Sequence, residues 1–225
     1  MRDPNRIFWN EQFKILQDTW PKPVNFEACI GIFLNLHAMV HSSEASQSGL
    51  YSFEDELWGS LTEEAFRRVR EGDQSIAWKL WHTGRIEDIT MNLLMAGDGQ
   101  VMNSGNWLDR LGIKARDTGN AMDEAEIGAL SAAINRQALK DYRTEVAKKT
   151  RKIVKALAPE DLRRKAEPAG VRRIWEEGAV VEEAAGIVDY WSRKTYAGLL
   201  LMPASRHILV HLNESLRLIG KGKPA

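Results

Sequence analysis

The clearest pattern in the chain is a helical repeat of apolar residues in its second half. After Asp123, apolar positions recur at steps of three or four residues with one longer gap, and charged residues fill most positions between them. The repeating positions are Ile127, Leu130, Ile134, Ala138, Tyr142, Val146, Ile153 and Leu157. This spacing predicts one long amphipathic helix. Asp123 and Glu126 have the spacing of a capping box and Pro159 follows the repeat, so we expect the helix to begin near residue 123 and end before residue 159.

Two other segments are apolar on nearly every side, which is typical of buried helices. They run from Phe26 to about residue 47 and from Ser75 to about residue 96. Asp73 is a candidate cap for the second segment, and the glycines at positions 97 and 99 are expected to end it. Between the two, the sequence from Ser60 to Glu63 predicts the start of a short amphipathic helix that stops at Gly72.

The last predicted helix runs from about residue 186 or 187 to residue 219. Pro203 interrupts it and is expected to kink it or to start a new segment, because proline removes a backbone donor and clashes with the preceding turn. Strand and hairpin patterns are weak throughout. Four long helices with three connections predict an all-α fold, a four-helix bundle with extra short helices. No shift in composition marks a boundary, so residues 1–225 are expected to form one domain.

Composition and charge exclude several classes of protein. Of 225 residues, 44% are hydrophobic and 28% are charged, a balance that excludes disordered and collagen-like chains. The 31 basic residues equal the 31 acidic ones, so no net charge attracts the chain to nucleic acid or to anionic membranes. The longest uncharged stretch, residues 28–43, is too short and too polar to span a bilayer, and no signal peptide is recognisable. With Cys29 as the single cysteine, these features predict a cytoplasmic protein.

All five histidines fall in predicted helices, and four of them form two pairs with a spacing of four residues. His37 pairs with His41 and His207 with His211, whereas His82 is alone on its helix. Side chains four residues apart lie on one helical face and can bind one cation. The faces around His82 and around the last pair are otherwise apolar and are expected to face the interior. His82, His207 and His211 are therefore candidate ligands of a divalent metal, and partly buried, hydrogen-bonded histidines are the alternative.

The same residues carry a resemblance to a known family. The segment Trp78-Lys-Leu-Trp-His-Thr-Gly-Arg-Ile-Glu-Asp88, together with Arg206-His-Ile-Leu-Val-His-Leu-Asn-Glu214, resembles the DinB superfamily of DinB/YfiT-like metalloproteins. These are four-helix bundles with one histidine on the second helix and a His-x-x-x-His on the fourth. The resemblance implies that His82, His207 and His211 hold a divalent transition metal, with zinc or nickel favoured over iron or manganese. In this chain Leu212-Asn213-Glu214 follows the last ligand, where relatives often carry a second adjacent histidine and Gly-Gln.

The resemblance also implies an activity and partners. Characterised relatives include S-transferases and isomerases that use small cytosolic thiols, so a thiol-dependent S-transferase or hydrolase acting on a small molecule is expected. A low-molecular-weight thiol is then a second cofactor, and a homodimer is the expected assembly. No nucleic acid or membrane partner is expected. The alternative is a non-catalytic helical protein that binds metal or forms a dimeric interaction module. A metal position that is open to solvent would separate the two hypotheses.

Several further residues are candidates for supporting or substrate-binding roles. One predicted helical face carries His37, His41 and Glu44. These residues are either a second ligand set or a group that supports the main metal site. The alternative, which we favour, is a polar stripe near a helix end. Of the three, His41 is expected to approach the metal.

Arg85 shares the face of His82 and could bind an anionic group, or pair with Glu54 or Glu214. Glu214 could orient an imidazole, and Trp78 could line a substrate pocket. Cys29 is expected to be an inert buried thiol.

Overall fold

The described part of the chain in this computed structural model, residues 3–20 and 25–220, is helical, with no strands. The α-helices are α1 (Pro4–Thr19), α2 (Phe26–Val40), α3 (Ser43–Ser46), α4 (Phe53–Ser60), α5 (Glu63–Arg67), α6 (Ile76–Asp88), α7 (Trp107–Leu111), α8 (Glu124–Ala133), α9 (Arg136–Lys155), α10 (Pro168–Glu176), α11 (Ala185–Ser192), α12 (Tyr196–Leu201) and α13 (His207–Gly220). Two segments are π-helical, η1 (Ile89–Ala96) and η5 (Met202–Arg206), and three are short 3-10 turns, η2 (Val101–Asn103), η3 (Pro159–Arg163) and η4 (Glu182–Ala184). The prediction of an all-α fold is confirmed.

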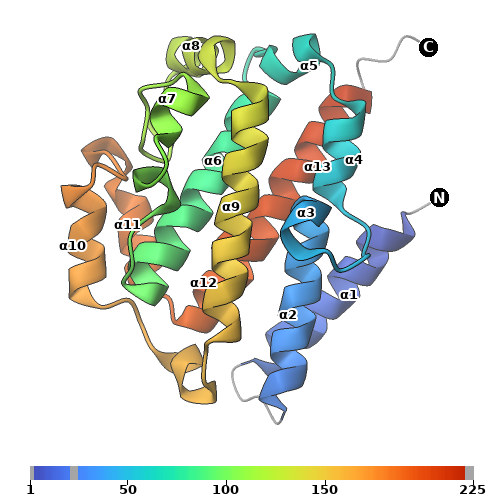
Figure 1. Ribbon diagram of the computed structural model, residues 1–225, viewed down its shortest axis with the longest axis vertical. Helices are drawn as coiled ribbons and strands as arrows, with labels where there is room; N and C mark the ends of the chain where they lie inside the picture. The colour runs from blue at the N-terminus through green and yellow to red at the C-terminus, as the bar shows by residue number, and fades with distance from the viewer. Residues whose placement is uncertain (1–2, 21–24, 221–225) are drawn as a thin grey trace.

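Helix α6 is the centre of the molecule. It packs against α9 on one side and α13 on the other, and α2 contacts both α9 and α13 (Figure 1). Every residue of α6 from Ile76 to Asp88 is buried. Polar side chains on this helix therefore lie in the protein interior, where each needs a partner.

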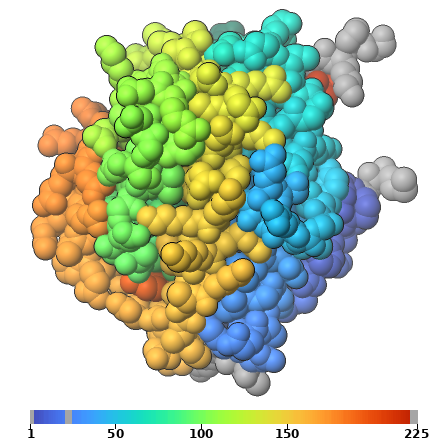
Figure 2. Space-filling model, viewed as in Figure 1, coloured from blue at the N-terminus to red at the C-terminus, as the bar shows by residue number. Residues whose placement is uncertain are grey.

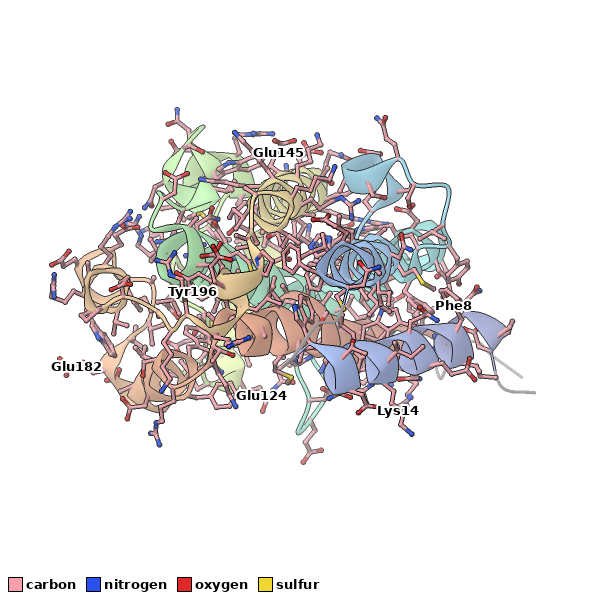
Figure 3. All side chains as sticks on the ribbon, turned by 90° about the horizontal axis from the view of Figure 1, so that it is seen from below. Phe8, Lys14, Glu124, Glu145, Glu182 and Tyr196 are labelled. Atoms are coloured by element: carbon pink, nitrogen blue, oxygen red, sulfur yellow. The ribbon has the colours of Figure 1, made fainter. Side chains whose placement is uncertain are left out.

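The remaining helices cover the outside of this central group. Helix α1 lies along α2 at one edge of the molecule, and Lys14 on it points away from the body in the view from below (Figure 3). Helices α10 and α11 lie at the opposite edge, where α10 packs on η1 (Figure 1). The basic helix α9 crosses one face of the molecule between the segment around residue 100 and α2 (Figure 2). Among the described residues, no helix has both the length and the apolar character needed to cross a membrane.

The long helix predicted after Asp123 is in fact two helices. The capping box of Asp123 and Glu126 is confirmed at the start of α8. The chain then leaves the helical conformation at Ile134 and Asn135, and the Asn135 side chain accepts a hydrogen bond from the backbone of Ala138 and so caps α9. The apolar repeat continues through the break because both helices bury the same side of the chain, which is why periodicity alone did not reveal it.

The first buried helix also ends earlier than predicted. Helix α2 stops at Val40, and His41 is extended, with φ −123° and ψ 164°. A separate turn, α3, follows, and the side chain of Ser42 caps it. The predicted helical face shared by His37, His41 and Glu44 therefore does not exist. The short helix predicted up to Gly72 is likewise only α5, which Thr62 caps and which ends at Arg67.

Two of the predicted long helices contain π-helical turns. The segment after Ser75 is α6 followed directly by η1; Ser75, not Asp73, caps it, and Gly97 ends it with φ 63° as predicted. The last predicted helix is divided into α11, α12, η5 and α13, and Thr195 caps α12. Pro203 lies within η5, where the widened turn accommodates a residue without a backbone donor.

Helix α1 was not predicted, although the sequence carries the features that define it. The side chain of Asp3 accepts a hydrogen bond from the backbone of Asn5, and Pro4 follows at the first helical position. Trp9, Phe13 and Leu16 form its buried face. The indole of Trp9 donates to the carbonyl of Leu36 over 3.1 Å, which fixes α1 to α2.

Candidate metal centre

Three imidazoles from two helices converge beside α6. His82 lies in the middle of α6, and His207 and His211 lie on the first two turns of α13. The ring centroid of His82 is 5.1 Å from that of His207 and 5.4 Å from that of His211. The Nε2 atoms of His207 and His211 are 3.2 Å apart, and one nitrogen of each of the three rings lies within 4.8 Å of the others. The structure thus brings together the three residues that the sequence pointed to, which we call the trihistidine site.

Hydrogen bonds on the outer nitrogens orient two of these rings. Nδ1 of His82 donates to the carbonyl oxygen of Thr118 over 2.6 Å, and Nδ1 of His211 donates to Oε2 of Glu214 over 2.9 Å. Because Nδ1 carries the proton in both rings, Nε2 of each has a lone pair that can bind a cation; Nε2 of His211 accepts a hydrogen bond from Nε2 of His207 over 3.2 Å. Nδ1 of the third ring, that of His207, is buried and has no partner among the described residues. Imidazoles that bind metals in proteins are typically held in this way by a carbonyl or carboxylate behind them.

A glycine allows the loop with Thr118 to approach α6 closely. Gly119 has φ 72°, and a Cβ atom there would lie 2.6 Å from the ring of Trp81 and 2.8 Å from Nε1 of Trp78. No other residue fits both the backbone conformation and the space. Trp78 in turn stacks on His82, with ring centroids 4.3 Å apart and planes at 11°. The predicted place of Trp78 beside the candidate metal site therefore agrees with the structure, and its role toward a substrate stays a prediction.

The electrostatic setting keeps the three imidazoles neutral. Burial lowers the pKa of His82 to about 4, and burial together with repulsion between the rings lowers the pKa of His207 to about 2 and that of His211 to about 3. Neutral imidazole is the form that binds metals. The side chain of His211 keeps 18% of its exposure, so solvent reaches the site from the side of α13. Lys79, which lies one turn before His82, contacts Glu214 at 3.3 Å and Asp73 at 2.7 Å.

The other two histidines lie in a second cluster. His37 at the end of α2, His41 just after it and Glu87 at the end of α6 are all buried, and one ligand atom of each lies within 4.8 Å of the others. We call this the α2–α6 cluster. The interpretation of His37, His41 and Glu44 as a polar stripe near a helix end is wrong, because the helix ends at Val40 and both histidine side chains are buried. Glu44 is not a member; it is exposed and pairs with Lys140 at 3.1 Å.

Glu87 was not identified from the sequence as a partner of His37 and His41. Its position on a helix that is apolar nearly all round was a sign of burial, but nothing local in the sequence links residue 87 to residues 37 and 41. The expectation that His41 is the member of its pair that approaches the metal site is wrong. In the structure His41 faces Glu87 and Glu54 instead.

Arg85 is buried in a network of protein groups. Its guanidinium donates to Asp88 over 3.0 Å, to the hydroxyl of Tyr142 over 2.8 Å and to Gln100 over 2.6 Å. It also donates to the carbonyl of Arg116 over 2.8 Å. The alternative of a pair with Glu54 or Glu214 is wrong, since Asp88 is the partner. The network ties α6 to α9 and to the loop around residue 100.

Two further features lie away from the histidines. Cys29 is a buried free thiol, as expected. A cavity of about 880 Å³ lies under α9 and is lined by residues that include Met95, Trp107, Lys149 and Tyr196, but by none of the histidines. Its size alone does not make it the site of chemistry, because the perturbed, convergent titratable groups are elsewhere.

The fold and the site together define an all-helical protein with a candidate trihistidine metal centre. Among protein families, the model of the DinB superfamily matches residues 55–185, more than half of the chain, and the chain belongs to this superfamily. The match includes His82 on α6 and ends before α13. A search of curated proteins finds no match.

Proposed function

We propose that this protein is a divalent-metal-dependent enzyme whose metal is held by His82, His207 and His211. The observation that carries the proposal is the convergence of three neutral imidazoles, two of which already have Nδ1 engaged by Thr118 and Glu214. The donor set fits a transition metal, because three imidazoles leave further positions for water or substrate. The four helices α2, α6, α9 and α13 would then form the bundle typical of the DinB/YfiT-like proteins, with α6 and α13 supplying the ligands.

The surrounding residues have separate parts in this proposal. The carbonyl of Thr118 and the carboxylate of Glu214 hold protons at Nδ1 of His82 and His211, which keeps Nε2 available. Trp78 covers the flat side of the His82 ring and excludes water there. A bound metal would supply a Lewis acid that lowers the pKa of a water or thiol toward neutrality. The partly exposed side of His211 is where a small substrate would approach.

The reaction class is thiol-dependent group transfer, with hydrolysis as the related possibility. The sulfur of a low-molecular-weight thiol would form a bond to an electrophilic carbon of a small molecule as the bond from that carbon to its leaving group breaks. The leaving group would depart with the electron pair of the broken bond, and the thiol proton would pass to it or to solvent. Zinc or nickel is the metal that suits imidazole ligands in this role. A homodimer is the assembly we propose. The support for these statements is the family, together with the chemistry of the donor set.

Metal titrations of single variants test the site itself. Changing His82, His207 or His211 to Ala should each lower zinc affinity by orders of magnitude at one site, while circular dichroism shows the helices unchanged. Arg217→Ala, an exposed change on α13, is the control and should leave affinity unchanged. Unchanged zinc binding in all three histidine variants would overturn the proposal.

A separate assay tests the reaction class. Zinc- or nickel-loaded protein should consume thiol in the presence of a small electrophile, and His207→Ala should lose that rate. If the loaded protein binds the metal but gives no metal-dependent consumption of thiol and no hydrolysis across a panel of small electrophiles and esters, the enzymatic part of the proposal is wrong and a non-catalytic metal-binding role replaces it.

A further inference from the structure

The α2–α6 cluster has a donor arrangement of its own. Nε2 of His37 lies 2.9 Å from Oε1 of Glu87, and Nε2 of His41 lies 3.0 Å from Oε2 of the same carboxylate. Each carboxylate oxygen thus faces a different imidazole. The three side chains are at most 2% exposed, and none of them belongs to the trihistidine site.

Several of these buried atoms lack hydrogen bonds. Among the described residues, both ring nitrogens of His41, Nδ1 of His37 and Oε2 of Glu87 have no hydrogen-bond partner. Although Nε2 of His41 and Oε2 of Glu87 are only 3.0 Å apart, their geometry is not that of a hydrogen bond. Buried polar atoms without partners are costly. Nδ1 of His41 faces Glu54 at 3.6 Å, whereas Nε2 of His41 and Oε2 of Glu87 face each other and mark the place where a cation would bind.

The charges around the cluster also point to a cation. The nearby carboxylate of Glu54 is neutralised by Arg143, which donates to both of its oxygens over 2.8 and 3.0 Å. Within the described ranges, Glu87 has no ion pair with a lysine or arginine; its only partners are the two imidazoles. A buried carboxylate of this kind requires a positive charge beside it.

We propose that His37, His41 and Glu87 form a second divalent-cation site, separate from the trihistidine site. Two imidazoles and one carboxylate are a donor set that zinc and ferrous iron bind in proteins. Three protein ligands leave a fourth coordination position, but because the three side chains are enclosed, that position does not face solvent. The cation would join the end of α2 to the end of α6 and stabilise the contact between them.

Metal stoichiometry of refolded protein tests this proposal. The full chain is unfolded in denaturant with a chelator, refolded with zinc so that the enclosed site can load, and dialysed before elemental analysis. The wild type should hold two zinc ions per chain, and the double variant His207→Ala/His211→Ala should hold one. Adding Glu87→Gln to the double variant should remove the remaining ion. Glu44→Gln, which alters an exposed carboxylate close by in the sequence, is the matched control and should change nothing.

Thermal unfolding tests the second site independently if the variants with Glu87→Gln fold poorly. Zinc should raise the unfolding temperature of the His207→Ala/His211→Ala protein, since a ligand that binds only the folded state stabilises it. No zinc in that double variant, and no rise in its unfolding temperature, would overturn the second site, as would two ions that persist in Glu87→Gln. If instead the wild type and the double variant each hold one ion, the second site is correct and the trihistidine site is wrong.

Discussion

His82 shows how one backbone carbonyl decides which imidazole nitrogen is available for chemistry. The carbonyl of Thr118 accepts a hydrogen bond from Nδ1, which keeps the proton on that nitrogen and leaves Nε2 directed toward His207 and His211. The spacing of His207 and His211 revealed their shared face in the sequence, because four residues make about one helical turn. Glu87 and Thr118 could not be found in the same way. Their partners are 50 and 36 residues distant in the sequence, and only the folded chain brings them together.

Glu214→Gln tests the orienting hydrogen bond behind His211. The amide oxygen of Gln can still accept a hydrogen bond from Nδ1 of His211, but it lacks the negative charge that raises the basicity of the ring. The zinc affinity of the trihistidine site should therefore fall about 10- to 100-fold. The measurement is competition with a chelator in a His41→Gln background, where the α2–α6 cluster is altered. Glu124→Gln on the exposed start of α8 is the control. Equal zinc affinities for Glu214→Gln and Glu124→Gln would contradict the orienting role of Glu214.

At the scale of helices, the apolar pattern predicted where buried helices lie but not where they end. Helix α2 stops at Val40 because His41 is extended, and the 123–157 segment divides at Asn135, which caps the next helix. Both breaks are fixed by contacts with distant residues. The hydroxyl of Ser52 donates to the carbonyl of His41 over 2.7 Å, and the backbone N–H of Asn135 donates to the carbonyl of Leu111 over 2.8 Å. A pattern of neighbouring residues does not contain that information.

The close contact between α10 and η1 predicts how a substitution at Gly170 changes the stability of the protein. A Cβ atom on Gly170 would lie 2.4 Å from the carbonyl oxygen of Leu93, a backbone atom that cannot rotate away. Gly170→Ala should therefore lower the free energy of unfolding by about 1–3 kcal/mol. Gly128→Ala in α8 meets no atom within 4 Å and should raise the free energy of unfolding by about 0.5–1 kcal/mol. Urea unfolding of the two variants compares them, and equal stabilities would contradict the close packing of α10.

For the molecule as a whole, the all-α class followed from the sequence because helical periodicity dominates it, and membership of the DinB superfamily is shown by the match over residues 55–185. The sequence favoured one metal site, at His82, His207 and His211, over a second ligand set at His37 and His41. The structure instead contains two buried clusters that share α6, because this one helix is buried on every side and carries both His82 and Glu87.

Acid should destabilise the metal-free protein through its buried histidines. Burial lowers the pKa of His37 and His82 from 6.5 to about 4, and those of His207 and His211 further still. Between about pH 6.5 and pH 4 the unfolded chain therefore binds more protons than the folded one, and stability falls as the pH decreases through that interval. Each histidine contributes up to about 1.4 kcal/mol for each pH unit. Denaturant unfolding in chelator from pH 7 to pH 5 measures this, and a flat profile would contradict the burial.

Anomalous diffraction from crystals of the zinc-loaded protein locates the metal that we assign to His82, His207 and His211. We expect an anomalous peak about 2.0–2.1 Å from one ring nitrogen of each of the three histidines, with Thr118 and Glu214 still bonded to Nδ1 of His82 and His211. A zinc-loaded crystal with no peak between α6 and α13, or with a peak bound by only one of the three rings, would contradict it.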